Sequence, residues 1–84
     1  MNNQIEVVRL NRFKGDGPLK AFADISLFDS VIIKGLRVVE GKKGLFVGMP
    51  REQSADGKWY DTVRPLNKEI KTVIEETVLA AYAT

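Results

Sequence analysis

The sequence predicts an α+β fold, in which an antiparallel β-sheet of four to five strands is followed by one C-terminal α-helix. Residues 19–27 alternate between apolar and mixed side chains, and this period of two is typical of a strand. Short turns separate the apolar segments up to residue 63. Such turns favour antiparallel pairing, because parallel crossovers need about a dozen or more residues. Beyond residue 67 the apolar spacing changes to three and four residues, which is typical of an amphipathic helix.

The first two strands are expected at residues 5–13 and 19–27. The first is rich in β-branched residues, which favour strands. Its consecutive apolar residues Val7 and Val8 leave open which face is buried. Residues 14–18 form the turn between the two strands, because glycine and proline are the residues that turns require.

The third and fourth strands are expected on either side of a charged turn at residues 41–44. Residues 31–40 form the third strand, and Gly35 interrupts it as a bulge or a close backbone approach would. Residues 45–49 form a short, almost wholly apolar strand, which predicts a central or doubly covered position. Pro50 ends this strand, because proline cannot donate to a hydrogen-bond ladder.

A polar loop and a short aromatic strand are expected next. Residues 51–58 form the loop, which is longer than most hairpin loops but carries Asp56-Gly57, a hairpin-turn signal. Residues 59–63 form the strand, and Pro65 breaks it. We expect one of the adjacent aromatic residues in this strand to enter the core, because neighbouring strand residues point to opposite faces.

The C-terminal segment is expected to form a helix of about 15 residues that covers one face of the sheet. Asn67 is suited to the N-cap, and Glu69 in the first turn suits the helix dipole. One apolar stripe follows at helical spacing: Ile70, Val73, Ile74, Thr77, Val78, Ala81 and Tyr82.

Composition narrows the possible classes of protein. A chain of 84 residues predicts a single domain, residues 1–84. The absence of cysteine and histidine excludes disulfides, thiolate or imidazole metal sites, and Ser-His-Asp or Cys-His nucleophiles. We therefore expect no enzyme, no catalytic residue and no metal site. A thin core without such staples favours self-association.

Targeting signals are not expected either. Residues 1–6 lack the basic start and apolar core of a signal peptide, and no apolar run approaches the roughly 20 residues that span a bilayer. These features predict a cytoplasmic protein without a membrane partner.

Two groups of residues are of types found in functional sites but are better explained as turn chemistry. The carboxylates near the turns show no metal-loop spacing, and turn or edge positions explain them: Asp24, Asp29, Glu40, Asp56 and Asp61. Gly15 and Gly17 lack the third glycine and the following helix of a dinucleotide-binding motif.

Charge and aromatic residues leave nucleic-acid binding open. The formal net charge is +2; residues 1–66 hold 11 basic and 8 acidic residues, and residues 67–84 hold 2 and 3. Trp59 or Tyr60 could stack on a base, or one could lie in the core and one at an edge or dimer seam. The basic candidates could contact phosphates or be ordinary solvated charges: Lys42, Lys43, Arg51, Lys58, Arg64, Lys68 and Lys71.

Several segments resemble the SpoVG family, the stage V sporulation protein G or septation-regulator proteins of bacteria. The most specific match is Leu36-Arg37-Val38-Val39-Glu40-Gly41 followed by Gly44-Leu45-Phe46-Val47-Gly48-Met49-Pro50. Val7 to Leu10, Leu19 to Leu27 and Tyr60 to Asn67 are similar to further segments of the family.

The resemblance implies a small homodimer that binds DNA, and sometimes RNA, as a regulator of septation, sporulation or gene expression. It also implies no cofactor and no small-molecule substrate. We expect phosphate contacts from five basic residues: Arg51, Lys58, Arg64, Lys68 and Lys71. We expect four apolar residues to build the core or the dimer seam: Leu45, Phe46, Val47 and Met49. The alternative is a protein-interaction module that does not bind nucleic acid directly.

Overall fold

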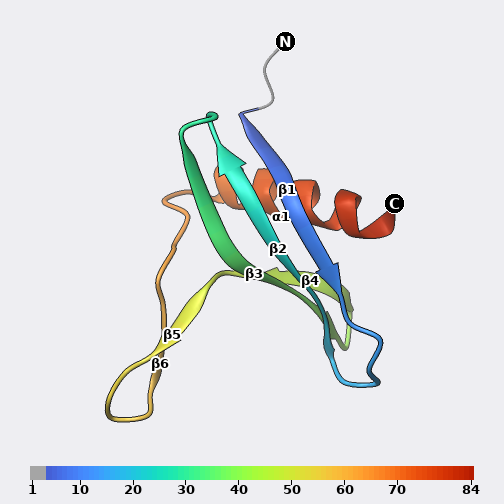
Figure 1. Ribbon diagram of the computed structural model, residues 1–84, viewed down its shortest axis with the longest axis vertical. Coiled ribbons are helices and arrows are strands. Elements are labelled where there is room, and N and C mark those ends of the chain that lie inside the picture. The colour runs from blue at the N-terminus through green and yellow to red at the C-terminus, as the bar shows by residue number, and fades with distance from the viewer. Residues whose placement is uncertain (1–3) are drawn as a thin grey trace.

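The computed structural model describes residues 4–84 and contains a four-stranded antiparallel sheet with one helix on it (Figure 1). Met1 to Asn3, part of the segment considered above for a signal peptide, lie outside the described residues. The spatial order of the strands follows the chain, β1-β2-β3-β4, as short turns between antiparallel neighbours require. Their bounds are β1 Ile5–Arg12, β2 Leu19–Leu27, β3 Val31–Gly41 and β4 Gly44–Gly48.

A separate two-stranded hairpin projects from the sheet before the chain enters the helix (Figure 1). It consists of β5, Arg51–Gln53, and β6, Trp59–Asp61, and the helix α1 spans Lys68–Ala83. The expected α+β class is confirmed. The expectation of a loop over residues 51–58 was partly wrong, because Arg51–Gln53 pair with β6 and only the turn at the tip is irregular.

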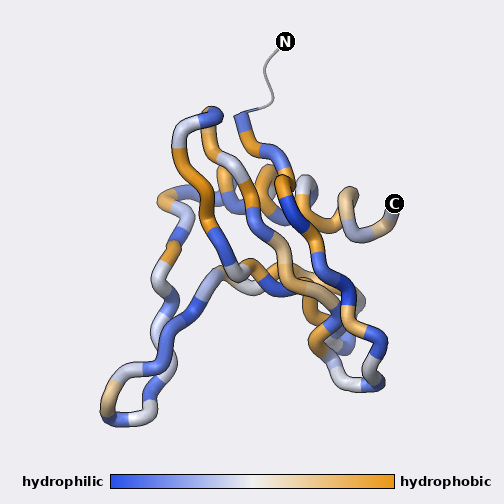
Figure 2. The backbone as a smooth tube through the Cα atoms, viewed as in Figure 1, coloured by the Kyte–Doolittle hydropathy of each residue, from blue (hydrophilic) through white to orange (hydrophobic). Residues whose placement is uncertain are grey.

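The hydrophobic core lies between α1 and one face of the sheet. On β2, Ala21, Ala23 and Ile25 are buried, whereas Phe22 between them is 37% exposed on the opposite face. Leu36 and Val38 of β3 and Val47 of β4 continue the buried layer, and Ile74 and Val78 of α1 close it. Figure 2 shows the apolar segments concentrated in the sheet and α1, while the hairpin is largely hydrophilic. Within residues 4–84, no helix covers the other face of the sheet.

Backbone irregularities in the sheet explain two ambiguous stretches of sequence. A register shift between Val7 and Arg9 leaves Val8 as an extra residue, so Val7 packs against the core and Val8 is exposed. A second shift opposite β2 falls at Gly35, whose φ of 89° suits glycine. The Gly35 N–H donates to Asp24 Oδ1 at 3.1 Å, which gives that carboxylate a structural role.

Both ends of α1 are satisfied by side chains. The Asn67 side-chain oxygen accepts from the Ile70 N–H at 2.8 Å, so the predicted N-cap is confirmed. At the other end, Arg12 of β1 donates to the main-chain oxygens of Ala81, Tyr82 and Thr84. A strand residue therefore fixes the last turn of the helix against the sheet.

The apolar strand β4 does not occupy the central position that its composition predicts. It forms one edge of the sheet, paired only with β3. Val47 and the following Met49 are buried, but Leu45 is 42% exposed and Phe46 47% exposed. The apolar run therefore reflects partial cover by α1 and not burial on both faces.

Candidate nucleic-acid interface

A groove lined by cationic side chains forms where β4, the hairpin and the start of α1 meet. Pro50 and Thr62 close the base of the hairpin, because the Pro50 carbonyl accepts from the Thr62 N–H at 2.9 Å and from its hydroxyl at 3.2 Å. This closure brings the segment before β5 next to the segment after β6. The cavity, here called the cationic groove, measures about 480 Å³. Four cations are among its lining residues: Arg37, Arg51, Arg64 and Lys71.

Three of the five basic residues expected to contact phosphates line this groove. Arg51 comes from β5, Arg64 from the segment after β6, and Lys71 from the first turns of α1. Lys58 lies instead at the hairpin tip, where its N–H donates to Asp56 Oδ1 at 3.1 Å. Lys68 is the exposed first residue of α1 and does not line the groove. The structure therefore brings three of the five predicted residues together in the groove and leaves Lys58 and Lys68 outside it.

Arg37 is the cation that sequence reasoning missed. It lies on the open face of β3 opposite Gly48, whose lack of a side chain lets the guanidinium extend across β4. A Cβ at Gly48 would stand 2.7 Å from Arg37 Cζ. Arg37 donates to the Met49 carbonyl at 3.3 Å, while its Nε is buried without a partner among the described residues. The apolar–polar alternation of residues 36–38 indicates that Arg37 lies on this face. Its position in the groove depends on the pairing with Gly48 of β4.

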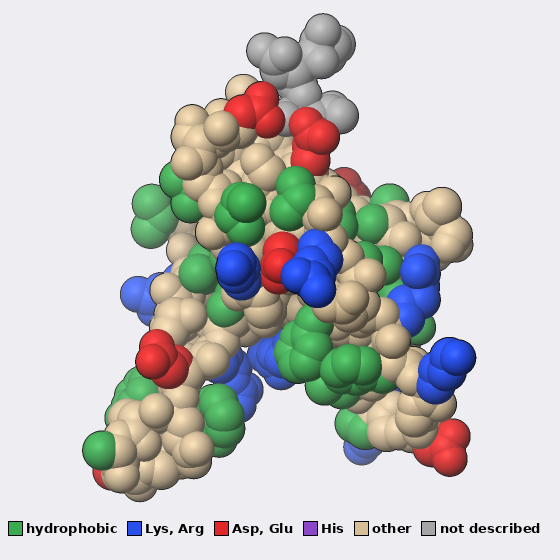
Figure 3. Space-filling model, in the orientation of Figure 1, with side chains coloured by type: hydrophobic (Ala, Val, Ile, Leu, Met, Phe, Trp, Pro, Cys, Tyr) green, Lys and Arg blue, Asp and Glu red, His purple; other side chains and the backbone are tan. Residues whose placement is uncertain are grey.

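The groove carries an excess of positive charge. Asp61 is the one carboxylate among its lining residues, against four cations. Arg51, Arg64 and Lys71 are exposed, so phosphates can reach them and salt in solution screens them. Figure 3 shows Lys and Arg side chains in the hollow between the projecting hairpin and the sheet.

Both aromatic residues of β6 are exposed. Trp59 is 56% exposed and Tyr60 52% exposed, so the expectation that one enters the core was wrong. The reason is that the hairpin projects from the sheet and has no second layer on either face. The Arg51 guanidinium lies 5.6 Å from the centre of the Trp59 ring, a cation–π contact at the rim of the groove.

The remaining carboxylates take part in turns and edges. Glu40 pairs with Lys20 at 3.4 Å, and Asp56 accepts from the Ser54 hydroxyl within the hairpin turn. The hydrogen bond from the Ser54 hydroxyl is the largest cause that lowers the pKa of Asp56, and the hydrogen bond from the Lys58 N–H is the second. Within residues 4–84, no three acidic side chains gather as a metal site would require, and no helix is long and apolar enough to cross a bilayer.

Comparison with known proteins decides the family. The SpoVG family model matches residues 3–84. The chain belongs to the SpoVG family. A protein from Archaeoglobus fulgidus named "Putative septation protein SpoVG" is 42% identical over 94% of this chain and 93% of its own length. Similar proteins are "Putative septation protein SpoVG 2" of Listeria monocytogenes, 39% identical over 94% and 78%, and one from Staphylococcus saprophyticus, 40% identical over 89% and 74%.

The family resemblance drawn from the residues is therefore confirmed. On this SpoVG scaffold, the segment from Leu36 to Pro50 positions the groove: it supplies Arg37, the glycine that admits it, and the proline that closes the hairpin base. The arrangement offers several donors and positive charges to an extended anion, and the described residues that line it supply no nucleophile–base pair.

Proposed function

We propose that this SpoVG-family protein binds nucleic acid, DNA and also RNA, through the cationic groove and acts as a regulator. The observation that carries the proposal is the convergence of Arg37, Arg51, Arg64 and Lys71 from four separate segments on one cavity. Cations so placed neutralise phosphates and release counterions, which gives affinity without reading sequence. Septation, the process in the relatives' names, is the process we propose for this chain, with sporulation or gene expression as further targets of the regulation.

The proposed assembly is a homodimer, which doubles the groove. Of the two sheet edges, β4 is the better seam. Its ladder with β3 has no register shift, whereas β1 bulges at Val8 and carries Arg9, and both features discourage edge pairing. Leu45 and Phe46 are the exposed apolar residues at the β4 edge, and Val47 and Met49 already pack in the core.

Binding is tested by fluorescence anisotropy with a labelled duplex at several salt concentrations. If the four cations of a groove contact phosphates, the logarithm of the affinity should fall with the logarithm of salt with a slope of about −3 to −4 for each groove that the duplex occupies. Arg64→Gln should reduce that slope by about 0.9 for each occupied groove. Lys43→Gln is the matched control, because it removes the same charge from the exposed β3–β4 turn and should leave the slope unchanged. Absence of binding to both this duplex and a single strand at low salt, or affinity insensitive to salt, refutes the proposal.

The assembly is tested by light scattering at micromolar concentration. A dimer is expected for the natural chain and a monomer for Phe46→Lys, because the seam would then bury one lysine charge from each protomer in place of two apolar rings. Val31→Lys, at an equally exposed position far from β4, serves as the control. A monomeric natural chain, or a Phe46→Lys variant that stays dimeric, contradicts the proposed seam.

A second candidate function is docking of a protein partner. Leu66 is 96% exposed and Phe28 57% exposed, and together they border an apolar cavity of about 340 Å³. Phe28 also holds a φ of 54°, which is costly for a bulky residue. A partner recovered after nuclease treatment by the natural chain, and lost with Leu66→Asp, would support docking. Equal recovery by both would exclude this surface.

A further inference from the structure

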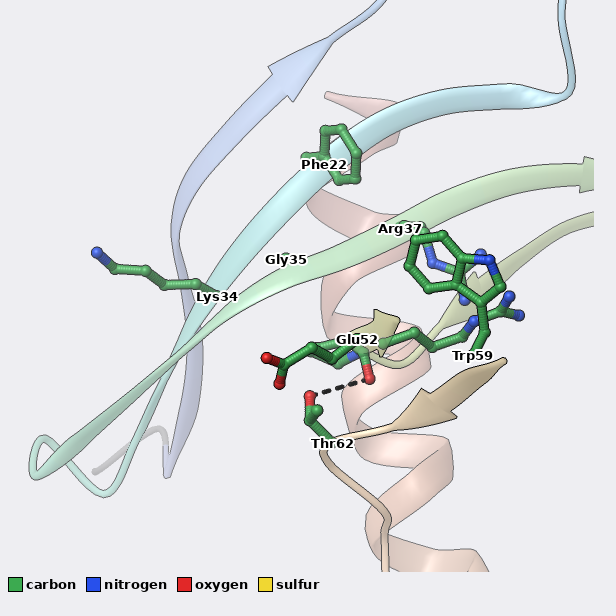
Figure 4. A pocket seen from close by; sticks show the side chains of 9 residues that line it. Phe22, Lys34, Gly35, Arg37, Glu52, Trp59 and Thr62 are labelled. Carbon is green, nitrogen blue, oxygen red and sulfur yellow. Dashed lines mark hydrogen bonds between the residues drawn. The ribbon is translucent and has the colours of Figure 1, made fainter. Parts of the chain in front are cut away.

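A second cavity adjoins the cationic groove on the open face of the sheet. It measures about 490 Å³, within the range of about 300–1,000 Å³ that small ligands occupy. Phe22 of β2 and Lys34 and Arg37 of β3 form its floor, and Arg51 and Trp59 of the hairpin form its wall (Figure 4). We call it the Trp59 cleft. Arg37 and Arg51 line both cavities, so the two cavities are adjacent. A polymeric ligand that lies in the groove can therefore place a neighbouring monomer in the cleft.

The aromatic residues of the cleft are available to a flat ligand. Trp59 is more than half exposed, and the Arg51 guanidinium near its ring adds a second flat, cationic surface. Phe22 is 37% exposed and is held by an edge-on contact with Phe13, at 5.1 Å between ring centres. Nucleobases stack on such surfaces with little sequence preference, because every base has a π-face.

The polar groups of the cleft suit the rest of a nucleotide. Arg37 and Arg51 present guanidinium groups to the cleft, and Arg37 Nε is a buried donor without a partner among the described residues. Glu52 is the carboxylate of the cleft, and Figure 4 shows its oxygens pointing away from Trp59 and Arg37. An anionic ligand can therefore reach the arginines without meeting that carboxylate.

We propose that the Trp59 cleft binds one unstacked base of a single-stranded nucleic acid whose phosphates lie in the cationic groove. The proposal rests on the proposed function, because it assumes that nucleic acid occupies the groove. In a duplex both faces of a base are covered by its neighbours, so a base enters the cleft only from a single strand, a loop or a bulge. The protein should thus prefer single strands over a duplex of the same composition.

Tryptophan fluorescence provides a direct test, because Trp59 is the only tryptophan in the chain. Single-stranded DNA and RNA 12-mers should quench its emission saturably, and a 12-bp duplex should bind without comparable quenching. In anisotropy titrations with the labelled 12-mers, Trp59→Ala should weaken binding about 10-fold, and Trp59→Phe by less, because phenylalanine still stacks. The salt slope should stay unchanged in both, since the phosphate contacts remain.

Tyr60→Ala is the matched control. Tyr60 is a similarly exposed aromatic residue on the same strand but does not line the cleft, so single-strand affinity should not change. Circular dichroism confirms that each variant is folded. Equal affinity for single strand and duplex, with Trp59 emission unquenched by either, overturns the cleft proposal but leaves the proposed function intact. Binding to neither nucleic acid overturns both.

Discussion

Arg12 provides a test of how the sheet holds the end of its helix. The residue lies on β1 and reaches α1, where its Nη2 donates to the main-chain oxygens of Ala81 at 3.2 Å, Tyr82 at 2.7 Å and Thr84 at 3.0 Å. Its guanidinium also lies 5.5 Å from the centre of the Tyr82 ring. The last turn of α1 contains no basic residue of its own, so Arg12 supplies the positive charge there. Arg12→Ala removes all of these contacts.

The expected loss of stability is about 1.5 kcal/mol. A cation at an exposed helix C-terminus contributes about 0.3–1 kcal/mol. An exposed cation–π contact contributes about 0.5–1 kcal/mol, and the net gain per hydrogen bond is about 0.5–1.5 kcal/mol. These contributions are not additive, because one solvent-exposed guanidinium makes all the contacts. In a domain of this size the loss corresponds to a fall in Tm of about 6–12 °C.

Urea denaturation followed by circular dichroism measures this loss, with all variants at one protein concentration because of the proposed dimer. Arg12→Lys keeps the charge and should recover about half of the stability. Arg9→Ala is the control, because Arg9 is exposed on the same strand and faces away from α1; its effect should stay within about 0.5 kcal/mol. Equal stability of Arg12→Ala and the natural chain would refute the role assigned to Arg12.

Three further predictions concern the helix cap, the groove and the hairpin turn. Asn67→Ala should cost about 1 kcal/mol in urea denaturation and Asn67→Ser much less, because serine also caps the helix start; equal losses would argue against a capping role. Gly48→Ala should displace the Arg37 guanidinium and so weaken duplex binding as much as Arg37→Gln does. Equal losses would show that both substitutions act on the same contact. Unchanged affinity in both variants would show that Arg37 does not belong to the interface. Ser54→Ala should raise the pKa of Asp56 toward its ordinary value in an NMR titration, since the Ser54 hydroxyl is the largest cause of its lowering. Because the folded pKa is depressed, the stabilisation from Asp56 is present above its ordinary pKa and is lost as the pH falls through the folded value. An unchanged titration in Ser54→Ala would show that the hydroxyl does not hold this carboxylate.

The structure and the sequence agree where the physical cause is local. The period-two pattern of β2 predicts its buried face, and Asn67 predicts the helix start, because both depend on residues a few positions apart. The Leu36 to Pro50 segment identified the SpoVG family from its side chains alone. The glycine in β3 marked one of the register shifts of the sheet, whereas the paired valines of β1 left open which face is buried.

The sequence by itself therefore determined the α+β class, the helix and the family of this protein. Only the tertiary structure decided that β4 lies at an edge, that Trp59 is exposed and that Arg37 joins the cationic groove. An apolar strand looks the same in sequence whether a second layer covers one face or both. The groove depends on contacts between β3, the hairpin base and α1, which lie far apart in the chain. Strand order and the projection of the hairpin set those distances, and no local pattern encodes them.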